Sequence, residues 1–97
     1  MIGVYVQPDD FDPGNEIAAL HAGRSDIGAV ASFVGLVRVD GALDSLTLDH
    51  YPAMTTRALL AIAAEAGDRW PLQGGTIIHR HGRLLPGERI VLVAVAS

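Results

Sequence analysis

Arginine supplies every strongly basic side chain in this sequence of 97 residues, which contains seven arginines and no lysine. A guanidinium group stays protonated at neutral pH, so it binds anions but cannot shuttle protons. Arg38 has the most suggestive setting, because it ends a long uncharged segment just before the turn-forming pair Asp40-Gly41. An arginine placed there can hold a phosphate or a carboxylate through two parallel hydrogen bonds. Taken alone, however, the residues favour the plainer interpretation, in which Arg38 simply extends into solvent.

Histidines offer a second chemistry. His79 and His81 fall on one face of an expected strand, and with His50 they could form a three-histidine metal site. No aspartate or glutamate is obviously placed to act as a fourth ligand or to orient the imidazoles. The plainer interpretation is a polar strand face with exposed histidines, so we predict no metal and no cofactor. The sequence contains no cysteine, which excludes thiolate catalysis and disulfides.

The amino-acid composition argues against several classes of binding partner. The formal net charge is −4, so the chain has no general electrostatic attraction for nucleic acid or for an anionic membrane. The longest apolar run, residues 90–96, is far too short to span a bilayer. Hydrophobic residues make up 49% of the sequence, which suffices for the core of one small domain over residues 1–97. Without cysteines or a secretory leader, the chain is expected to be cytoplasmic.

One strand and two helices are expected to form the part of the fold that supports these residues. Residues 2–6 are β-branched and aromatic and predict a first strand. Asp12 is a suitable N-cap for a short helix over residues 13–21, with Ile17 and Leu20 facing inward. The main helix is predicted over residues 52–70, with an ion pair between Glu65 and Arg69 on its outer face. Its apolar residues recur at helical spacing and predict an inward stripe, formed by Leu59, Ile62, Ala63, Ala66 and Trp70.

The segment before Arg38 is predicted to be the centre of the sheet. Residues 28–37 carry no charge, which is typical of a strand buried on both faces. Gly35 within this segment indicates a bulge or the close approach of another backbone. We expect this strand to form a hairpin with residues 43–51 through the turn at Asp40-Gly41.

A second hairpin is expected near the end of the sequence. Residues 76–83 and 89–96 are strand-like, and Pro86-Gly87 between them suits the centre of a type II turn. Hairpins therefore dominate, and the predicted class is α+β with a largely antiparallel sheet and two helices. Because residues 89–96 are apolar enough to need cover on both faces, we expect more chain beyond Ser97.

Five linked blocks of sequence resemble one known family, the molybdopterin synthase large (catalytic) subunit family. One of them, with the letters LTLDHYPAM, is similar to the family pattern L-x-L-E-H-Y-x-x-M, with Asp49 in place of the commoner glutamate. In chain order the blocks are residues 28–35 with Val37-Arg38, residues 46–55, residues 69–72, residues 78–84 and residues 86–88.

The resemblance implies a hammerhead-type α+β fold and an enzyme of molybdenum cofactor biosynthesis that works as a homodimer of large subunits. Each large subunit of that family receives the Gly-Gly tail of a ubiquitin-like small subunit. The tail carries a thiocarboxylate, whose sulfur is transferred to cyclic pyranopterin monophosphate (precursor Z) to give molybdopterin.

The resemblance also implies a substrate-binding segment formed by Leu36, Val37 and Arg38, with Phe33 close by. Arg38 would bind the phosphate of the substrate, while the block from His79 to Glu88 would be scaffold. The turn after Arg38 is shorter than is usual in the family. The family's His-Arg pair and catalytic lysines are expected beyond Ser97, so no catalytic residue is assigned and the domain is expected to be C-terminally incomplete. The alternatives are a non-catalytic homologue that binds a partner and the histidine-based metal module.

Overall fold

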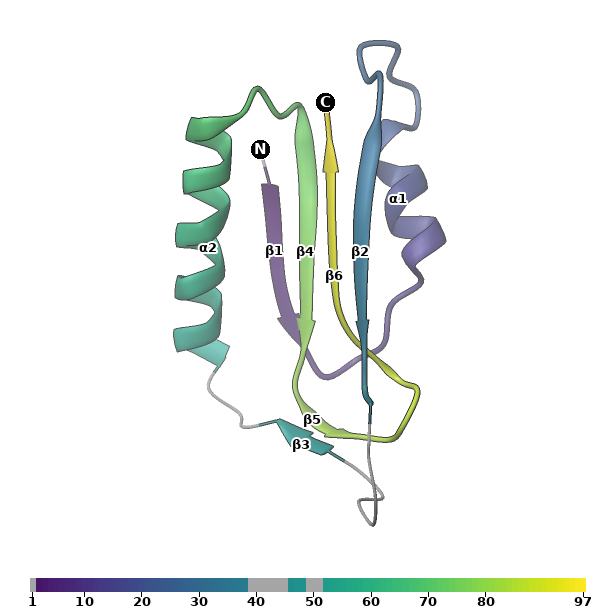
Figure 1. Cartoon of the computed structure of the whole chain (residues 1–97), viewed down its shortest axis with the longest axis vertical. Coiled ribbons are helices and arrows are strands. Elements are labelled where there is room, and N and C mark those ends of the chain that lie inside the picture. The colour runs from purple at the N-terminus through teal and green to yellow at the C-terminus, as the bar shows by residue number, and fades with distance from the viewer. Residues whose placement is uncertain (1, 39–45, 49–51) are drawn as a thin grey trace.

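The described residues form a four-stranded sheet with two helices and a separate two-stranded ribbon (Figure 1). A computed structural model describes residues 2–38, 46–48 and 52–97. The strands of the larger sheet lie in the order β1-β4-β6-β2, and β3 pairs with β5 in the ribbon. The elements are β1 (Ile2–Gln7), α1 (Pro13–His21), β2 (Val30–Leu36), β3 (Leu46–Leu48), α2 (Pro52–Arg69), β4 (Gly74–Arg80), β5 (Gly82–Leu84) and β6 (Arg89–Ala96).

The larger sheet is mixed but mostly antiparallel, as the predicted fold class requires. β4 and β6 pair antiparallel, from Gly74 opposite Ala96 to His79 opposite Val91. This pairing confirms the second predicted hairpin, although its first strand ends at Arg80. β2 also pairs antiparallel with β6. Only β1, which runs parallel to β4, departs from the antiparallel pattern among these strands.

The first predicted hairpin is wrong. β2 pairs with β6 over its whole length, while the three residues of β3 pair with β5, where Leu46 lies opposite Leu84. The Asp40-Gly41 turn itself lies outside the described residues. A pairing is selected by the hydrophobic surface that it covers, and β6 offers β2 a much longer apolar partner than β3 does. A local turn signal therefore did not decide which strands meet.

The position of β2 within the sheet also differs from the prediction. β2 is an edge strand, and its side chains Phe33 and Leu36 are 62% and 55% exposed. The centre of the sheet is formed by β4 and β6, where Leu92 and Ala94 are fully buried. An uncharged sequence shows that a strand is apolar, but it does not show whether this chain buries both of its faces.

Helix α1 covers one face of the sheet. The main core lies beneath it and contains Phe11, Ile78, Leu92 and Ala94, against which Ile17 and Leu20 pack as predicted. The Asp12 carboxylate caps the helix as expected by accepting a hydrogen bond from the Asn15 N–H at 3.0 Å.

Helix α2 packs along β1, beside the sheet (Figure 1). Because it contacts mainly this strand, only a narrow part of the predicted stripe is covered. Ala63 is buried and Leu59 and Ala66 are half-buried, but Ile62 and Trp70 are exposed, so the prediction was wrong for these two. Neither α1 nor α2, the helices within the described ranges, is long and apolar enough to cross a membrane.

Candidate functional site

A bulge ends the regular part of β2. Gly35 lies opposite Val91, but the next residue, Leu36, pairs with Arg89, so the register skips Ile90. A Cβ atom on Gly35 would lie 2.7 Å from Cγ1 of Val91, closer than any real side chain tolerates. The bulge expected at Gly35 is therefore confirmed, and the group that approaches this glycine closely is the Val91 side chain rather than another backbone.

Beyond the bulge, Val37 is fixed to the chain segment that precedes β6. Its N–H donates to the Glu88 carbonyl at 2.8 Å, and its own carbonyl accepts from the Gly87 N–H at 3.0 Å. The Val37 side chain is only 4% exposed. Arg38, the next residue, is exposed. An exposed cation thus follows directly on a buried and hydrogen-bonded residue.

The segment that holds Val37 is the type II turn predicted from Pro86-Gly87. The Glu88 N–H donates to the Leu85 carbonyl at 3.0 Å, and Gly87 has a φ of 86°, a value that glycine adopts without strain. The carboxylate of Glu88 also accepts a hydrogen bond from the Leu85 N–H. Glu88 therefore bonds to Leu85 twice, through its own N–H and through its carboxylate, and these two bonds join the last residue of the turn to the first.

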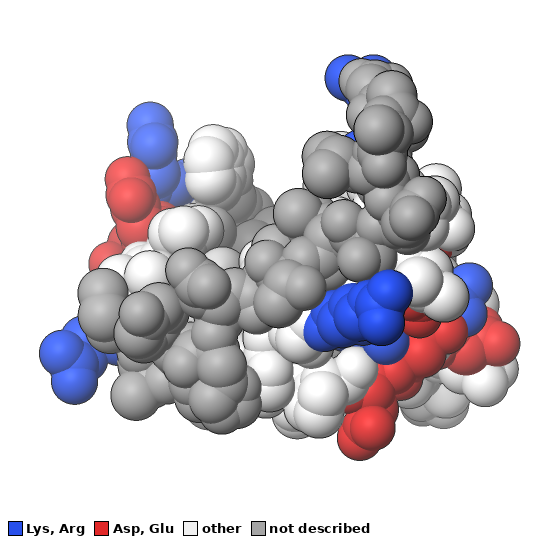
Figure 2. Space-filling model, turned by 90° about the horizontal axis from the view of Figure 1, so that it is seen from below, with Lys and Arg blue, Asp and Glu red and all other residues white. Residues whose placement is uncertain are grey.

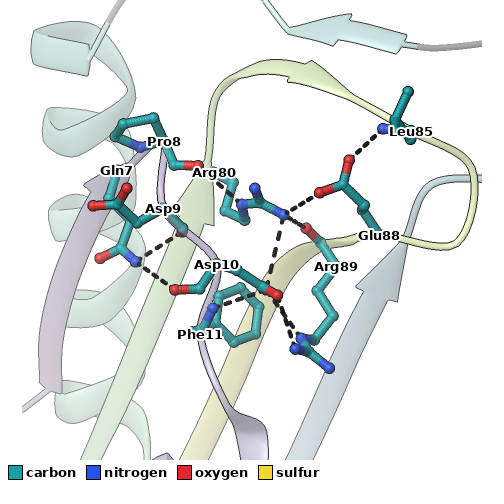
Figure 3. A network of polar contacts seen from close by, with 9 residues as sticks. All are labelled: Gln7, Pro8, Asp9, Asp10, Phe11, Arg80, Leu85, Glu88 and Arg89. Atoms are coloured by element: carbon teal, nitrogen blue, oxygen red, sulfur yellow. Dashed lines mark hydrogen bonds and ion pairs between the residues drawn. The ribbon is translucent and has the colours of Figure 1, made fainter.

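Arg80, at the end of β4, joins this turn to two other segments (Figure 3). Its Nη1 donates to the Arg89 carbonyl at 2.9 Å and to Oε1 of Glu88 at 3.4 Å, and its Nε donates to the Pro8 carbonyl at 3.1 Å. Oδ1 of Asp10 lies 3.8 Å from the same Nη1. The side chain of Arg80 is only 8% exposed. A buried guanidinium needs such partners, because leaving the charge uncompensated is costly.

Asp10 and Arg89 form the outer part of this network. Nε and Nη2 of Arg89 donate to the two carboxylate oxygens of Asp10 at 3.1 and 2.9 Å. These bonds lower the pKa of the Asp10 carboxyl, helped by the Phe11 N–H, and they raise the pKa of Arg89. The Arg89 guanidinium also lies 5.9 Å from the centre of the Phe11 ring. Figure 2 shows acidic and basic side chains adjoining at this end of the molecule.

The predicted substrate-binding residues therefore fall into two groups. Phe33 and Leu36 are exposed along β2, and Arg38 is exposed where the strand has ended. The side chain of Val37 is buried, so at this position only its backbone adjoins the exposed Arg38.

Known proteins share this arrangement of elements. A family model described as MoaE protein matches residues 6–97. The chain belongs to the MoaE protein family. A Mesorhizobium japonicum protein named molybdopterin synthase catalytic subunit is 59% identical over 95 residues, which cover 97% of this chain and 60% of that relative. The chain thus spans about 60% of the length of this curated relative.

Solved structures agree with the family. A structure described as a molybdopterin biosynthesis MoaE protein from Burkholderia ambifaria has a TM-score of 0.88 and 50% identity, and the match covers 100% of this chain and 65% of that one. A Helicobacter pylori structure has a TM-score of 0.73 at 21% identity, and it covers 99% of this chain and 64% of the other. Its description is a protein–protein complex of subunits 1 and 2 of molybdopterin-converting factor, and at this identity it supports the fold alone.

Two of the three histidines in the predicted metal site of this MoaE family chain, His79 and His81, lie within the described residues. His79 is half-buried in β4, and its Nδ1 lies 2.8 Å from the Arg80 carbonyl. His81 follows the end of β4, and its N–H donates to the Gln7 carbonyl at 3.1 Å. His50 lies outside the described residues. Within residues 2–38, 46–48 and 52–97, no group of three or more histidines, aspartates or glutamates could hold a metal ion.

Sequence reasoning missed the network around Arg80. It assigned the block from His79 to Glu88 to scaffold, without recognising that Arg80 would be buried or that Asp10 would join it. A signal was present in the sequence, because the charge of Arg80 closely follows the uncharged, largely apolar residues 76–78 of a predicted strand. A buried arginine requires acceptors, but their identity depends on segments that lie far apart in the sequence.

Proposed function

We propose that this chain is the substrate-binding part of a molybdopterin synthase catalytic subunit. In this reaction sulfur passes from a thiocarboxylate on a small partner subunit to cyclic pyranopterin monophosphate (precursor Z), giving molybdopterin. The observation that carries the proposal is the 59% identity, over nearly the whole chain, with a relative that is named a molybdopterin synthase catalytic subunit. The proposed setting is the cytoplasm.

The proposed substrate-binding residues are Phe33, Leu36, Val37 and Arg38. The two backbone hydrogen bonds of Val37 support this assignment, because they hold the start of Arg38 while its guanidinium reaches into solvent. A guanidinium held in this way can form two parallel bonds to the phosphate of the substrate. The exposed ring of Phe33 and the side chain of Leu36 offer apolar surface to the pterin.

The proposed partners are a ubiquitin-like small subunit, which delivers its Gly-Gly thiocarboxylate tail, and a second copy of the large subunit. The apolar surface of β6 supports self-association, because Val91, Val93 and Val95 alternate with the residues beneath α1 and stay half-buried. Light scattering should show a dimer, and deletion of the Gly-Gly tail should abolish binding of the small subunit. A strict monomer at high concentration would contradict the first expectation, and unchanged binding the second.

Substitution of Arg38 tests the site. Arg38→Ala should weaken the binding of precursor Z by about 1.5–3 kcal/mol, or roughly 10- to 160-fold in Kd, as expected for loss of a charge-assisted contact. Arg57→Ala is the matched control, because Arg57 is exposed on α2 and should contribute little. Titration calorimetry measures both. If the two variants bind alike, Arg38 is only a surface charge.

A turnover assay distinguishes an active enzyme from a non-catalytic homologue. The protein that carries this sequence should convert precursor Z to a dithiolene-bearing pterin when it is supplied with the thiocarboxylated small subunit, and Arg38→Ala should reduce that conversion. Binding of both the pterin and the small subunit without any conversion would instead support a non-catalytic homologue that serves as a partner-binding subunit.

A further inference from the structure

We propose that Glu88, held by Arg80, is a positioning residue for Arg38. The inference rests on the proposed function, because Arg38 is taken to bind the phosphate of the substrate. Neither Glu88 nor Arg80 is expected to touch the substrate. Their contribution is to fix the backbone from which Arg38 extends.

The first step is the attachment of Val37. The backbone hydrogen bonds of Val37, to the Glu88 carbonyl and from the Gly87 N–H, both go to the turn before β6. The bulge makes this possible, because Leu36 pairs with Arg89 and so brings Val37 opposite the turn. Arg38 is one residue further along. A shift of the turn therefore moves the backbone of Arg38 with it.

The second step is the attachment of the turn. One oxygen of the Glu88 carboxylate accepts from the Leu85 N–H within the turn, and the other accepts from Nη1 of Arg80 (Figure 3). The side chain of Glu88 thus links the turn to the end of β4.

The third step is the immobility of Arg80. Its guanidinium is buried and bonded to the carbonyls of Pro8 and Arg89 as well as to Glu88. A second ion pair in the chain, Glu65 with Arg69, has the same N–O distance of 3.4 Å, which confirms the pair predicted from the sequence. Both of its side chains are more than 60% exposed, so water competes for them and the pair restrains little. In the pair at Arg80 the guanidinium is only 8% exposed and the Glu88 side chain 36%, so water has less access to this pair than to the one on α2.

Such an anchor matters for an arginine that binds through a fork of two hydrogen bonds. A binding group generally has to be held within about 0.5 Å of its productive position. The long side chain of Arg38 loses rotamer freedom when it binds, and a mobile backbone would add to this cost. Fixing the strand end on the turn removes the backbone part of the cost before the ligand arrives.

Paired glutamine substitutions test the inference. Glu88→Gln keeps the shape of the side chain and one acceptor for the Leu85 N–H but removes the charge that pairs with Arg80. It should raise the Kd for precursor Z about tenfold, within the range seen when residues that act together are uncoupled. Glu65→Gln removes a charge from a pair with the same N–O distance and should leave the Kd unchanged. In the Arg38→Ala background, Glu88→Gln should have no further effect on the Kd.

Hydrogen exchange of the Val37 amide gives a readout that needs no substrate. Glu88→Gln should speed the exchange of this amide, while amides in the middle of β6 keep their protection. A lower melting temperature with unchanged Kd and unchanged Val37 exchange would overturn the inference, because it would reduce Glu88 to a stabilising residue. An equal loss of binding from Glu88→Gln with and without Arg38 would overturn it as well.

The two proposals fail in different ways. If Arg38→Ala weakens binding but Glu88→Gln matches Glu65→Gln, the positioning role is wrong and the proposed function stands. If Arg38→Ala has no effect on binding, the proposed substrate site is wrong, and the positioning role falls with it even where the Val37 amide exchanges faster.

Discussion

Strands β6 and β2 are neighbours in the sheet and are similarly apolar, but they are buried to different extents. β6 lies between β4 and β2 and beneath α1, and its residues Leu92, Ala94 and Ala96 are fully buried. β2 has β6 as its only strand partner among the described residues, and it exposes Phe33 and Leu36. Equal hydrophobicity therefore does not mean equal burial.

The difference teaches where a binding segment can be placed. An interior strand contributes stability because its side chains leave water, and it has no surface to offer a ligand. An edge strand keeps one side free, so it can expose apolar and charged groups while the neighbouring strand holds it in place. The bulge at Gly35 and the attachment of Val37 mark the point where β2 changes from sheet to candidate site.

The largest effect is expected when a leucine is replaced by alanine in β6, and the same replacement in β2 provides the comparison. Leu92→Ala should lower the free energy of unfolding by about 2–5 kcal/mol, because it leaves a cavity in the core. Leu36→Ala should change the same free energy by no more than about 0.5 kcal/mol, because that side chain is already exposed. Urea denaturation followed by circular dichroism measures both. Similar losses for the two variants would show that β2 is buried in solution.

A second prediction concerns the contact between the strands. Gly35→Ala should destabilise the fold by about 1–3 kcal/mol, because its Cβ would meet Val91, a β-branched side chain with little freedom to move. Gly67→Ala in α2 meets nothing within 4 Å and should instead stabilise by about 0.5–1 kcal/mol. Adding Val91→Ala to Gly35→Ala should restore part of the loss. Gly35→Ala with native stability would mean that the strands separate more easily than the structure implies.

Features set by a few adjacent residues could be predicted from the sequence. The cap at Asp12, the irregularity at Gly35 and the turn at Pro86-Gly87 each depend on local backbone chemistry, and each was found where expected. Pairings that depend on distant segments were missed in part. The parallel contact of β1 with β4 joins two strands that lie far apart in the sequence, and no local pattern specifies it.

In the candidate site, too, the features set by adjacent residues could be predicted, while those that depend on distant segments could not. The position of Arg38 after an apolar strand follows from the sequence, but the inward direction of Val37 does not, because the bulge changes which residues face the core. The partners of Arg80 come from before α1 and from the turn before β6. Each partner, taken alone, looks like an ordinary loop residue.

A third and smaller effect concerns the start of β6, which Arg89 ties to Asp10. Hydrogen bonds from Arg89 hold the pKa of the Asp10 carboxyl below its ordinary value of 3.8. The resulting stabilisation is therefore complete well above pH 3.8 and disappears as the pH falls through the lowered value. Asp10→Asn should reduce stability at neutral pH and converge with the native chain in acid, as measured by melting temperature against pH. Asp68→Asn, on the exposed side of α2, controls for the lost charge, and an identical pH profile for the two variants would contradict the assignment.

The smallest expected effect on stability lies at Phe33 in the middle of β2. Because its ring is largely exposed, Phe33→Ala should change the free energy of unfolding by no more than about 0.5 kcal/mol. The same substitution should weaken the binding of precursor Z by about two- to twelvefold, the loss expected for one aromatic contact. Tyr5→Ala is the matched control, because Tyr5 is an exposed aromatic residue on β1, the other edge strand. It should leave binding unchanged.

Two outcomes would contradict this prediction. If Phe33→Ala instead destabilises the fold like Leu92→Ala, β2 is a structural strand of the same kind as β6. If both aromatic variants bind precursor Z normally, Phe33 is not part of the substrate site.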